Sequence, residues 1–305
     1  MISATKPLAT RNWQPTTPLV GREIELAQLH AWMAKALQGE RQVVFVTGEP
    51  GIGKTTLIEA FLNGCDSEEK TKQKAKRADQ LPTPSTQPLA PSPWIGRGQC
   101  IEHFGAGEAY LPVLAALGQL GQESGGERLV ALLDRYAPTW LIQMPALLSP
   151  THLDALQRKT LGATRERMLR EMAEAVEALT SEQPLVLVLE DLHWSDYSTL
   201  ELLSFLARRR QPARLLVLGT YRPVEVIVRE HPLKVVEQEL HLHQQCEELA
   251  VGFLAESDVA QYLSVRFPAS RLPADLARAI HQRTDGNPLF MVNVVNDLIA
   301  QGVVK

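Results

Sequence analysis

One nine-residue segment, GEPGIGKTT (48–56), limits what this chain can fold into more than any other feature. It matches the pattern G-x-x-x-x-G-K-[ST] at every required position. An unbroken apolar run, QVVFV (42–46), precedes it, and a helix-forming run, TTLIEAFL, follows it. A buried strand, a glycine-rich turn and a helix in this order predict a loop whose backbone N–H groups surround phosphate oxygens. We expect phosphate contacts from Gly48, Gly51, Ile52, Gly53, Lys54, Thr55 and Thr56.

Two side chains of this segment carry chemistry of their own. Lys54 supplies a positive charge to the terminal phosphates of a nucleotide, an attraction of about 4 kcal/mol per charge pair near the protein surface. The hydroxyl of Thr55 is a suitable ligand for Mg²⁺. The segment therefore predicts the binding of ATP together with Mg²⁺.

A second pattern, LVLVLEDLHWSD, is an apolar run that ends in two carboxylates. Such a run predicts a buried strand whose tip presents Glu190 and Asp191 beside the phosphate loop. Both are candidate Mg²⁺ ligands. By position we assign Glu190 to the metal and Asp191 to the attacking water. His193 is interpreted either as a contact to the γ-phosphate or as a partly buried histidine with satisfied hydrogen bonds, and the second interpretation is favoured.

A third pattern is Arg222, which directly follows the apolar run LLVLGTY. The tip of a strand that neighbours the phosphate loop lies within reach of a γ-phosphate, where a guanidinium can sense or stabilise charge. A surface arginine after a strand is also common, and the two interpretations are equally supported.

A helix is predicted at about 198–210, with Ser198 and Glu201 at the spacing of a capping box. It ends on three consecutive arginines (208–210). These could reach the nucleotide of a neighbouring molecule, but favourable charge at a helix C-terminus is the preferred interpretation.

Other kinds of site are weakly supported. His241, His243 and Cys246 form H-x-H-x-x-C without a fourth ligand, so a metal site there is disfavoured. No nucleophile elbow is present, and the glycines at 96–107 lack dinucleotide-binding spacing. Three widely spaced cysteines suit a reducing compartment.

Composition excludes further classes. With 31 basic and 35 acidic residues the net charge is −4, so the chain as a whole has no electrostatic reason to hold nucleic acid or an anionic membrane. No apolar stretch approaches the roughly 18 residues of a membrane span, and the first residues lack the apolar block of a secretory signal. We therefore expect a cytoplasmic protein.

The order of these segments predicts an α/β fold with a parallel sheet sandwiched by helices. Residues 19–253 are expected to form this core, and 254–305, which read as helical and strandless, a small lid domain. An extended leader is expected at 1–18. The segment 64–93 is highly charged and then proline-rich, and it is interpreted as a disordered insertion.

Taken together, LVGREIEL, GEPGIGKTT, LVLVLEDLHWSD, LLVLGTYRP and TDGNPLF occur in the order found in signal-transduction ATPases of the STAND class. The chain most closely resembles the origin-recognition-complex-like AAA ATPase modules of bacterial cyclases and LuxR-type regulators. The resemblance covers about 19–305 without the insertion, and it implies a P-loop NTPase fold with a helical lid.

The resemblance also implies roles for further residues. It places Val20, Gly21 and Arg22 near adenine and ribose, makes Arg222 the sensor arginine, and packs Pro288 against the base. Larger relatives continue into a winged helix and an output domain, whereas this sequence stops at QGVVK. The chain is thus expected to be a truncated module or to act through a partner protein.

Two functions follow as hypotheses. The first is a signalling ATPase that binds ATP and hydrolyses it slowly, as a nucleotide-dependent switch; the absence of a convincing arginine finger in the sequence suits slow turnover. The second is a non-hydrolysing, ATP-dependent interaction module that recruits a partner, which Glu190 in place of the more usual aspartate would favour. A DNA-binding ATPase is disfavoured, because this acidic chain shows no basic winged helix.

Overall fold

The computed structural model describes residues 18–65, 92–102, 108–268, 270, 272–302 and 304. The leader predicted at 1–18 lies outside these residues except for residue 18. The insertion predicted at 64–93 lies outside them except for 64, 65, 92 and 93. Both interpretations stay predictions.

The chain divides into two compact units. The larger, here called the sheet unit, spans Glu23–Gly252. The smaller, here called the helical unit, combines Phe253–Lys305 with the residues that precede Glu23.

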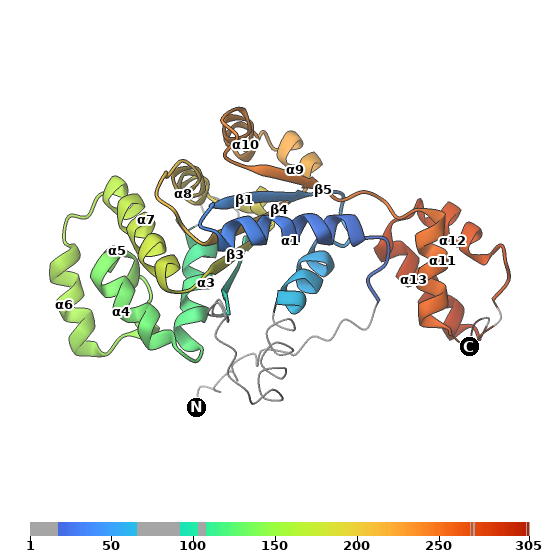
Figure 1. Cartoon of the computed structure of the whole chain (residues 1–305), viewed down its shortest axis with the longest axis horizontal. Coiled ribbons are helices and arrows are strands. Elements are labelled where there is room, and N and C mark those ends of the chain that lie inside the picture. The colour runs from blue at the N-terminus through green and yellow to red at the C-terminus, as the bar shows by residue number, and fades with distance from the viewer. Residues whose placement is uncertain are drawn as a thin grey trace, which may run out of the picture. The chain divides into compact units, whose positions relative to one another are not determined.

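In the described part of the sheet unit, five parallel strands form one sheet in the order β2-β3-β4-β1-β5, which confirms the predicted α/β fold (Figure 1). The apolar runs form the three central strands, which are covered on both faces, as near-continuous hydrophobic strands of a parallel sheet should be. The short strand β5 was not predicted. The strands are β1 Gln42–Thr47, β2 Trp94–Gln99, β3 Leu185–Glu190, β4 Leu215–Tyr221 and β5 Glu247–Ala250.

Helices cover both faces of this sheet. Alternate side chains of β1, β3 and β4, among them Phe45, Leu187 and Val217, join one buried cluster with residues of α3, α4, α7, α8 and α10. Helix α1 contacts β1 and β4 through a stripe that includes the buried Leu29 and Met33. The helices of the unit are α1 Glu23–Leu37, a helix over 54–65, α3 Leu111–Gln122, α4 Gly126–Tyr136, α5 Pro138–Leu141, α6 Pro150–Thr160, α7 Arg165–Glu182, α8 Tyr197–Ala207, α9 Pro223–Val228 and α10 Leu233–Leu242, with 3-10 turns η1 Pro145–Leu147 and η2 Leu192–Trp194.

The predicted capping box of α8 is wrong. The helix begins at Tyr197, and its N-cap is Asp196, whose Oδ1 accepts a hydrogen bond from the N–H of Thr199 at 2.9 Å. An aspartate is among the best N-cap residues, so it displaces the start of the helix by one residue and places Ser198 inside the first turn.

The helix also ends before the three arginines, at Ala207. Arg208 forms an ion pair with Glu239, and Arg209 donates two hydrogen bonds to Glu177 at 2.8 Å. These contacts lie where β1 and β4 begin, whereas the phosphate loop follows the opposite end of β1. Arg208 and Arg209 therefore tie α8 to neighbouring helices through ion pairs, and the last turn of α8 itself contains no basic residue, contrary to the preferred interpretation.

Among the residues of the helical unit that the structure describes, three helices are present, α11 Glu256–Arg266, α12 Leu276–Thr284 and α13 Pro288–Ala300. Val20, from the N-terminal segment, is buried in its core beside residues of α11, α12 and α13. Gly286 ends the turn after α12 with φ 73°, and an added Cβ there would lie 2.1 Å from the carbonyl oxygen of Leu254. Only glycine fits such a conformation and such a close backbone approach. Within the described parts of both units, no helix combines the length and apolar character needed to cross a membrane.

Candidate functional site

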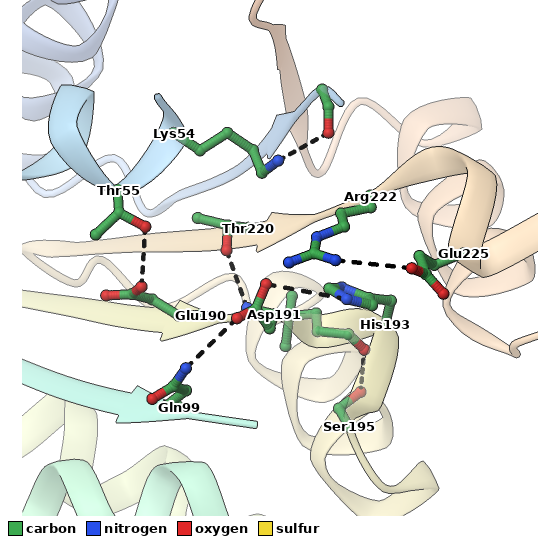
Figure 2. Close-up of polar contacts among 12 residues, drawn as sticks. Lys54, Thr55, Gln99, Glu190, Asp191, His193, Ser195, Thr220, Arg222 and Glu225 are labelled. Atoms are coloured by element: carbon green, nitrogen blue, oxygen red, sulfur yellow. Dashed lines mark hydrogen bonds and ion pairs between the residues drawn. The ribbon is translucent and has the colours of Figure 1, made fainter. Parts of the chain in front are cut away.

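The carboxyl ends of three neighbouring strands carry the predicted site residues. The strand order places β1 beside β4 and β4 beside β3. The phosphate loop follows β1, Glu190 and Asp191 end and follow β3, and Arg222 follows β4. Figure 2 shows Lys54, Thr55, Glu190, Asp191 and Arg222 around one region of this edge. Ligands of open α/β sheets bind at this edge, outside the carboxyl ends of the strands.

The loop itself depends on glycine at its first position. Gly48 has φ 148°, and an added Cβ would lie 2.7 Å from the carbonyl oxygen of Val251. The N–H of Val251 also donates to the carbonyl of Thr47 at 2.8 Å, so the chain that leaves β5 passes directly against the start of the loop. Ile52 is buried and anchors the middle of the loop in the core.

Lys54 lies over this loop. Its Nζ donates hydrogen bonds to the carbonyls of Gly48 at 2.7 Å and Glu49 at 3.1 Å. Burial, together with the nearby charge of Arg222, lowers the pKa of Lys54 to about 8, and the charges of Asp191 and Glu49 oppose this shift. A buried ammonium whose pKa is held down gains from an arriving anion, because the anion stabilises its charged form.

Thr55 and Glu190 meet at the position expected for a metal. The hydroxyl of Thr55 donates to Oε2 of Glu190 at 3.2 Å, although the first lies on the helix over 54–65 and the second ends β3. Burial raises the pKa of Glu190, and the nearby cation Arg97 together with the Thr55 hydroxyl partly offsets this. A hydroxyl and a carboxylate in contact are hard oxygen ligands of the kind that Mg²⁺ takes, so these residues fit that ion.

Asp191 is held in a left-handed backbone conformation, with φ 57° and ψ 46°. Its N–H donates to the hydroxyl of Thr220 at 2.9 Å, and its Oδ2 accepts from Gln99 at 3.5 Å. Aspartate tolerates this conformation better than most residues, and the two contacts help to fix it. Sequence reasoning missed Thr220 and Gln99. Both lie at or near the ends of strands that flank β3, so the signal becomes visible only once the strand order is known.

His193 is buried, as the favoured interpretation held, but its hydrogen bonds are not satisfied. Its side chain is 0% exposed, and neither ring nitrogen has a hydrogen-bond partner among the residues that the structure describes. Its Nε2 lies 3.9 Å from Oδ1 of Asp191. Burial lowers the pKa of His193 to about 4.

Arg222 forms a loose ion pair with Glu225, at 3.7 Å, across the first turn of α9. Its charge lowers the pKa of both Lys54 and His193, which places it near both groups. The guanidinium is one third exposed and therefore accessible to a ligand.

The remaining predicted contacts belong to the helical unit. Gly21 has φ 61°, and an added Cβ would lie 2.4 Å from Cγ of Asp258 on α11. Val20 and Arg22 on either side of it are buried. Pro288 is the first residue of α13, directly after the N-cap Asn287. The roles of these residues toward adenine and ribose stay predictions.

The disfavoured metal site at His241, His243 and Cys246 is not formed. The two histidines lie at the end of α10, and the thiol of Cys246 contacts the carbonyl of Glu237. In the described part of the chain, no group of three or more His, Cys, Asp or Glu side chains has the geometry to hold a metal ion.

Comparison with known proteins supports the fold and identifies a family. A family model described as AAA ATPase domain matches residues 18–218. A relative from Rhizobium meliloti (strain 1021), named "Uncharacterized protein R02095", is 26% identical over 289 residues, which cover 91% of this chain and 25% of that protein. This chain thus spans a quarter of the length of that relative.

Solved structures are similar at lower identity. The Walker-type ATPase PABY2304 of Pyrococcus abyssi superimposes with a TM-score of 0.54 and 16% identity, covering 93% of this chain and 69% of that chain. The ORC1 protein of Aeropyrum pernix, solved in complex with DNA, gives a TM-score of 0.44 and 13% identity, over 90% and 58% of the two chains. The first of these likenesses supports the fold described above.

Proposed function

The chain belongs to the AAA ATPase domain family, and from this premise we propose that it binds ATP with Mg²⁺ and hydrolyses it slowly, as a nucleotide-dependent switch of the STAND type. The observation that carries the proposal is the meeting of Lys54, the Thr55–Glu190 pair and Asp191 at one edge of the sheet. At this edge Lys54 is available for phosphate, the Thr55–Glu190 pair for the metal and Asp191 for water.

In the proposed reaction the loop amides and Lys54 bind the β- and γ-phosphates. Thr55 and Glu190 hold Mg²⁺, which when bound neutralises part of the phosphate charge. Asp191 accepts a hydrogen bond from a water and orients it toward the γ-phosphorus. The water oxygen bonds to that phosphorus, a water proton passes to Asp191 and then to the phosphate, the bond to the β–γ bridging oxygen breaks, and ADP and inorganic phosphate result. Arg222 stabilises charge that develops on the γ-phosphoryl oxygens.

The finer parts of the proposal concern regulation. Val20, Gly21 and Arg22 contact adenine and ribose, Pro288 packs against the base, and ATP and ADP favour different conformations. A partner protein or an output domain in the cytoplasm reads this difference.

Equilibrium binding of ATP and release of phosphate test the proposal in the wild type, in Lys54→Ala and in the control Lys234→Ala. Lys234 lies exposed on α10, away from the site, so its loss should change nothing. We expect Lys54→Ala to weaken ATP binding by at least about 100-fold, as loss of a buried charge contact of a few kcal/mol would. Equal binding by the wild type and Lys54→Ala would contradict the proposal.

A second candidate function is ATP binding without hydrolysis, as an interaction module. The observation that favours it is the raised pKa of Glu190, since a carboxyl that resists ionisation is a weaker metal ligand. Turnover above background that disappears in Asp191→Asn would exclude this alternative.

A further inference from the structure

His193 is enclosed among the charged groups of the site without a hydrogen bond of its own. The charges that act on its ring are those of Asp191, Arg222, Glu225 and Lys54. Figure 2 shows the ring between the Asp191 carboxylate and the Arg222–Glu225 pair. Neither ring nitrogen has a partner within the described residues, and the side chain is fully buried.

The backbone after β3 aims the ring at Asp191. The left-handed conformation of Asp191 opens the turn η2, in which the N–H of Trp194 donates to the carbonyl of Asp191 at 2.9 Å. This turn brings a side chain two residues along the chain back beside the carboxylate, with 3.9 Å between His193 Nε2 and Asp191 Oδ1. The ring also packs against Trp194, at 5.2 Å between centroids, which limits its rotation.

A buried histidine without a hydrogen bond reduces the stability of the fold, so its presence at this position indicates a functional role. A buried polar group without a partner destabilises a protein, whereas an apolar side chain of similar size would fill the same space without that cost. An imidazole carries a proton on at least one ring nitrogen at neutral pH, so His193 has an N–H donor to offer. The Asp191 carboxylate, with Oδ1 at 3.9 Å from Nε2, is an acceptor within a short movement of that donor.

We propose that His193 is a positioning residue for the ATPase reaction: its Nε2–H donates a hydrogen bond to Oδ1 of Asp191 and fixes the carboxylate that orients the attacking water. A movement of about 1 Å closes the present separation to a hydrogen bond. Gln99 contacts the other carboxylate oxygen, so the two side chains hold Asp191 from both sides. This inference rests on the proposed function.

The test separates the two ring nitrogens by substitution. The amide nitrogen of His193→Gln falls near the position of Nε2, that of His193→Asn falls near Nδ1, and His193→Leu removes both. His243→Gln, at an exposed position after α10, is the control. Steady-state hydrolysis at saturating ATP and Mg²⁺ gives kcat for each protein, and equilibrium titration gives the Kd for ATP.

We expect His193→Asn and His193→Leu to lower kcat by about 10- to 100-fold, because a misplaced orienting group costs that much. Their Kd for ATP should stay within about twofold of the wild type, since Asp191 does not bind the ground state. His193→Gln should retain kcat within about threefold. If His193→Leu does not fold, the matched Gln and Asn variants still decide the question.

Four results would overturn the inference. The first is wild-type kcat in His193→Asn, and the second is an equal loss in His193→Gln and His193→Asn, which would indicate a packing role. The third is a loss confined to Kd, which would indicate direct phosphate binding. A wild type that binds ATP without any turnover would also overturn it while leaving nucleotide binding intact. A wild type that binds no ATP would instead remove the proposed function itself.

Discussion

The sheet unit and the helical unit both contain residues predicted to contact a nucleotide, but they hold them by different means. In the sheet unit the candidate groups are buried ionisable side chains. Burial moves the pKa of Lys54 and His193 down and that of Glu190 up, away from the charged form in each case. In the helical unit, Gly21 lies close to the Asp258 side chain, and Gly286 lies close to the Leu254 backbone.

This difference predicts which property, ligand binding or folding, a substitution in each unit should affect first. Groups whose charged forms are disfavoured by burial are ready to respond to an arriving ion, so changes there should alter binding more than folding. A glycine that has a positive φ and lies close to a neighbouring residue leaves no room for a Cβ. Its replacement by another residue should therefore reduce folding stability before it affects binding. Four substitutions probe this contrast, in order of decreasing effect.

The largest effect is expected for Gly286→Ala. The new Cβ would lie 2.1 Å from a backbone oxygen at φ 73°, and overpacking together with an unfavourable φ should cost about 3 kcal/mol of unfolding free energy. Thermal and denaturant unfolding measure the loss. Gly302→Ala is the matched control, because it has φ 71° but nothing within 4 Å, and should cost about 1 kcal/mol. Equal losses of unfolding free energy in the two variants would show that the close contact at Gly286 does not contribute to the stability of the helical unit.

Asp196→Ala should follow, with a loss of about 2 kcal/mol. Asp196 caps α8 through Thr199 and also accepts the N–H of Tyr110 at 3.2 Å, so two backbone donors lose their partner. Chemical denaturation of this variant and of Ser198→Ala compares the observed cap with the residue that the sequence pattern favoured. A greater loss in Ser198→Ala would contradict the observed cap.

Glu190→Gln should act on binding rather than on folding. Loss of the carboxylate is expected to weaken the apparent Mg²⁺ affinity of the ATP complex about tenfold, which corresponds to about 1.4 kcal/mol. Titration of Mg²⁺ at fixed ATP measures this, and ATP binding in a chelator should be unchanged. If Glu190→Gln lowers the unfolding free energy by more than it lowers the free energy of Mg²⁺ binding, the proposed difference between the two units is wrong.

The smallest effect concerns the pH dependence of stability in the sheet unit. Burial raises the pKa of Glu237, whose carboxylate accepts a hydrogen bond from Tyr221 at 2.6 Å. A carboxyl with a raised folded-state pKa contributes stability at low pH that is lost as pH rises through that pKa. Glu237→Gln should therefore lessen the fall in unfolding free energy above pH 4.5, by less than about 1 kcal/mol. Glu230→Gln, at an exposed position after α9, is the control and should reproduce the wild-type pH profile.

Much of the sheet unit could be predicted because its signals are local. Each central strand is a continuous apolar run, and the phosphate loop is a contiguous pattern that follows one of them. Strand β5 escaped prediction because only one of its four residues is buried, and its hydrogen bonds to β1 stabilise it in place of an apolar pattern. It is specified by the sheet that it joins.

The supporting groups of the site could not be predicted for a related reason. Thr220 and Gln99 contact Asp191 because β4 and β2 lie on either side of β3. No single segment of the sequence indicates this strand order. Ser198 was the predicted cap, and the contact of the observed cap, Asp196, to Tyr110, 86 residues away, is not visible in a local pattern. The unsatisfied state of His193 likewise depends on packing, which a short sequence window does not contain.

The position of the chain directly after β5 has a consequence for the phosphate loop. Val251 binds the carbonyl of Thr47 and abuts Gly48, and two residues later, at Phe253, the helical unit begins. The first residue after β5 is thus fixed to the end of β1 by one hydrogen bond and lies close to the first glycine of the phosphate loop. A substitution that moves the backbone of Val251 should therefore change the geometry of the loop.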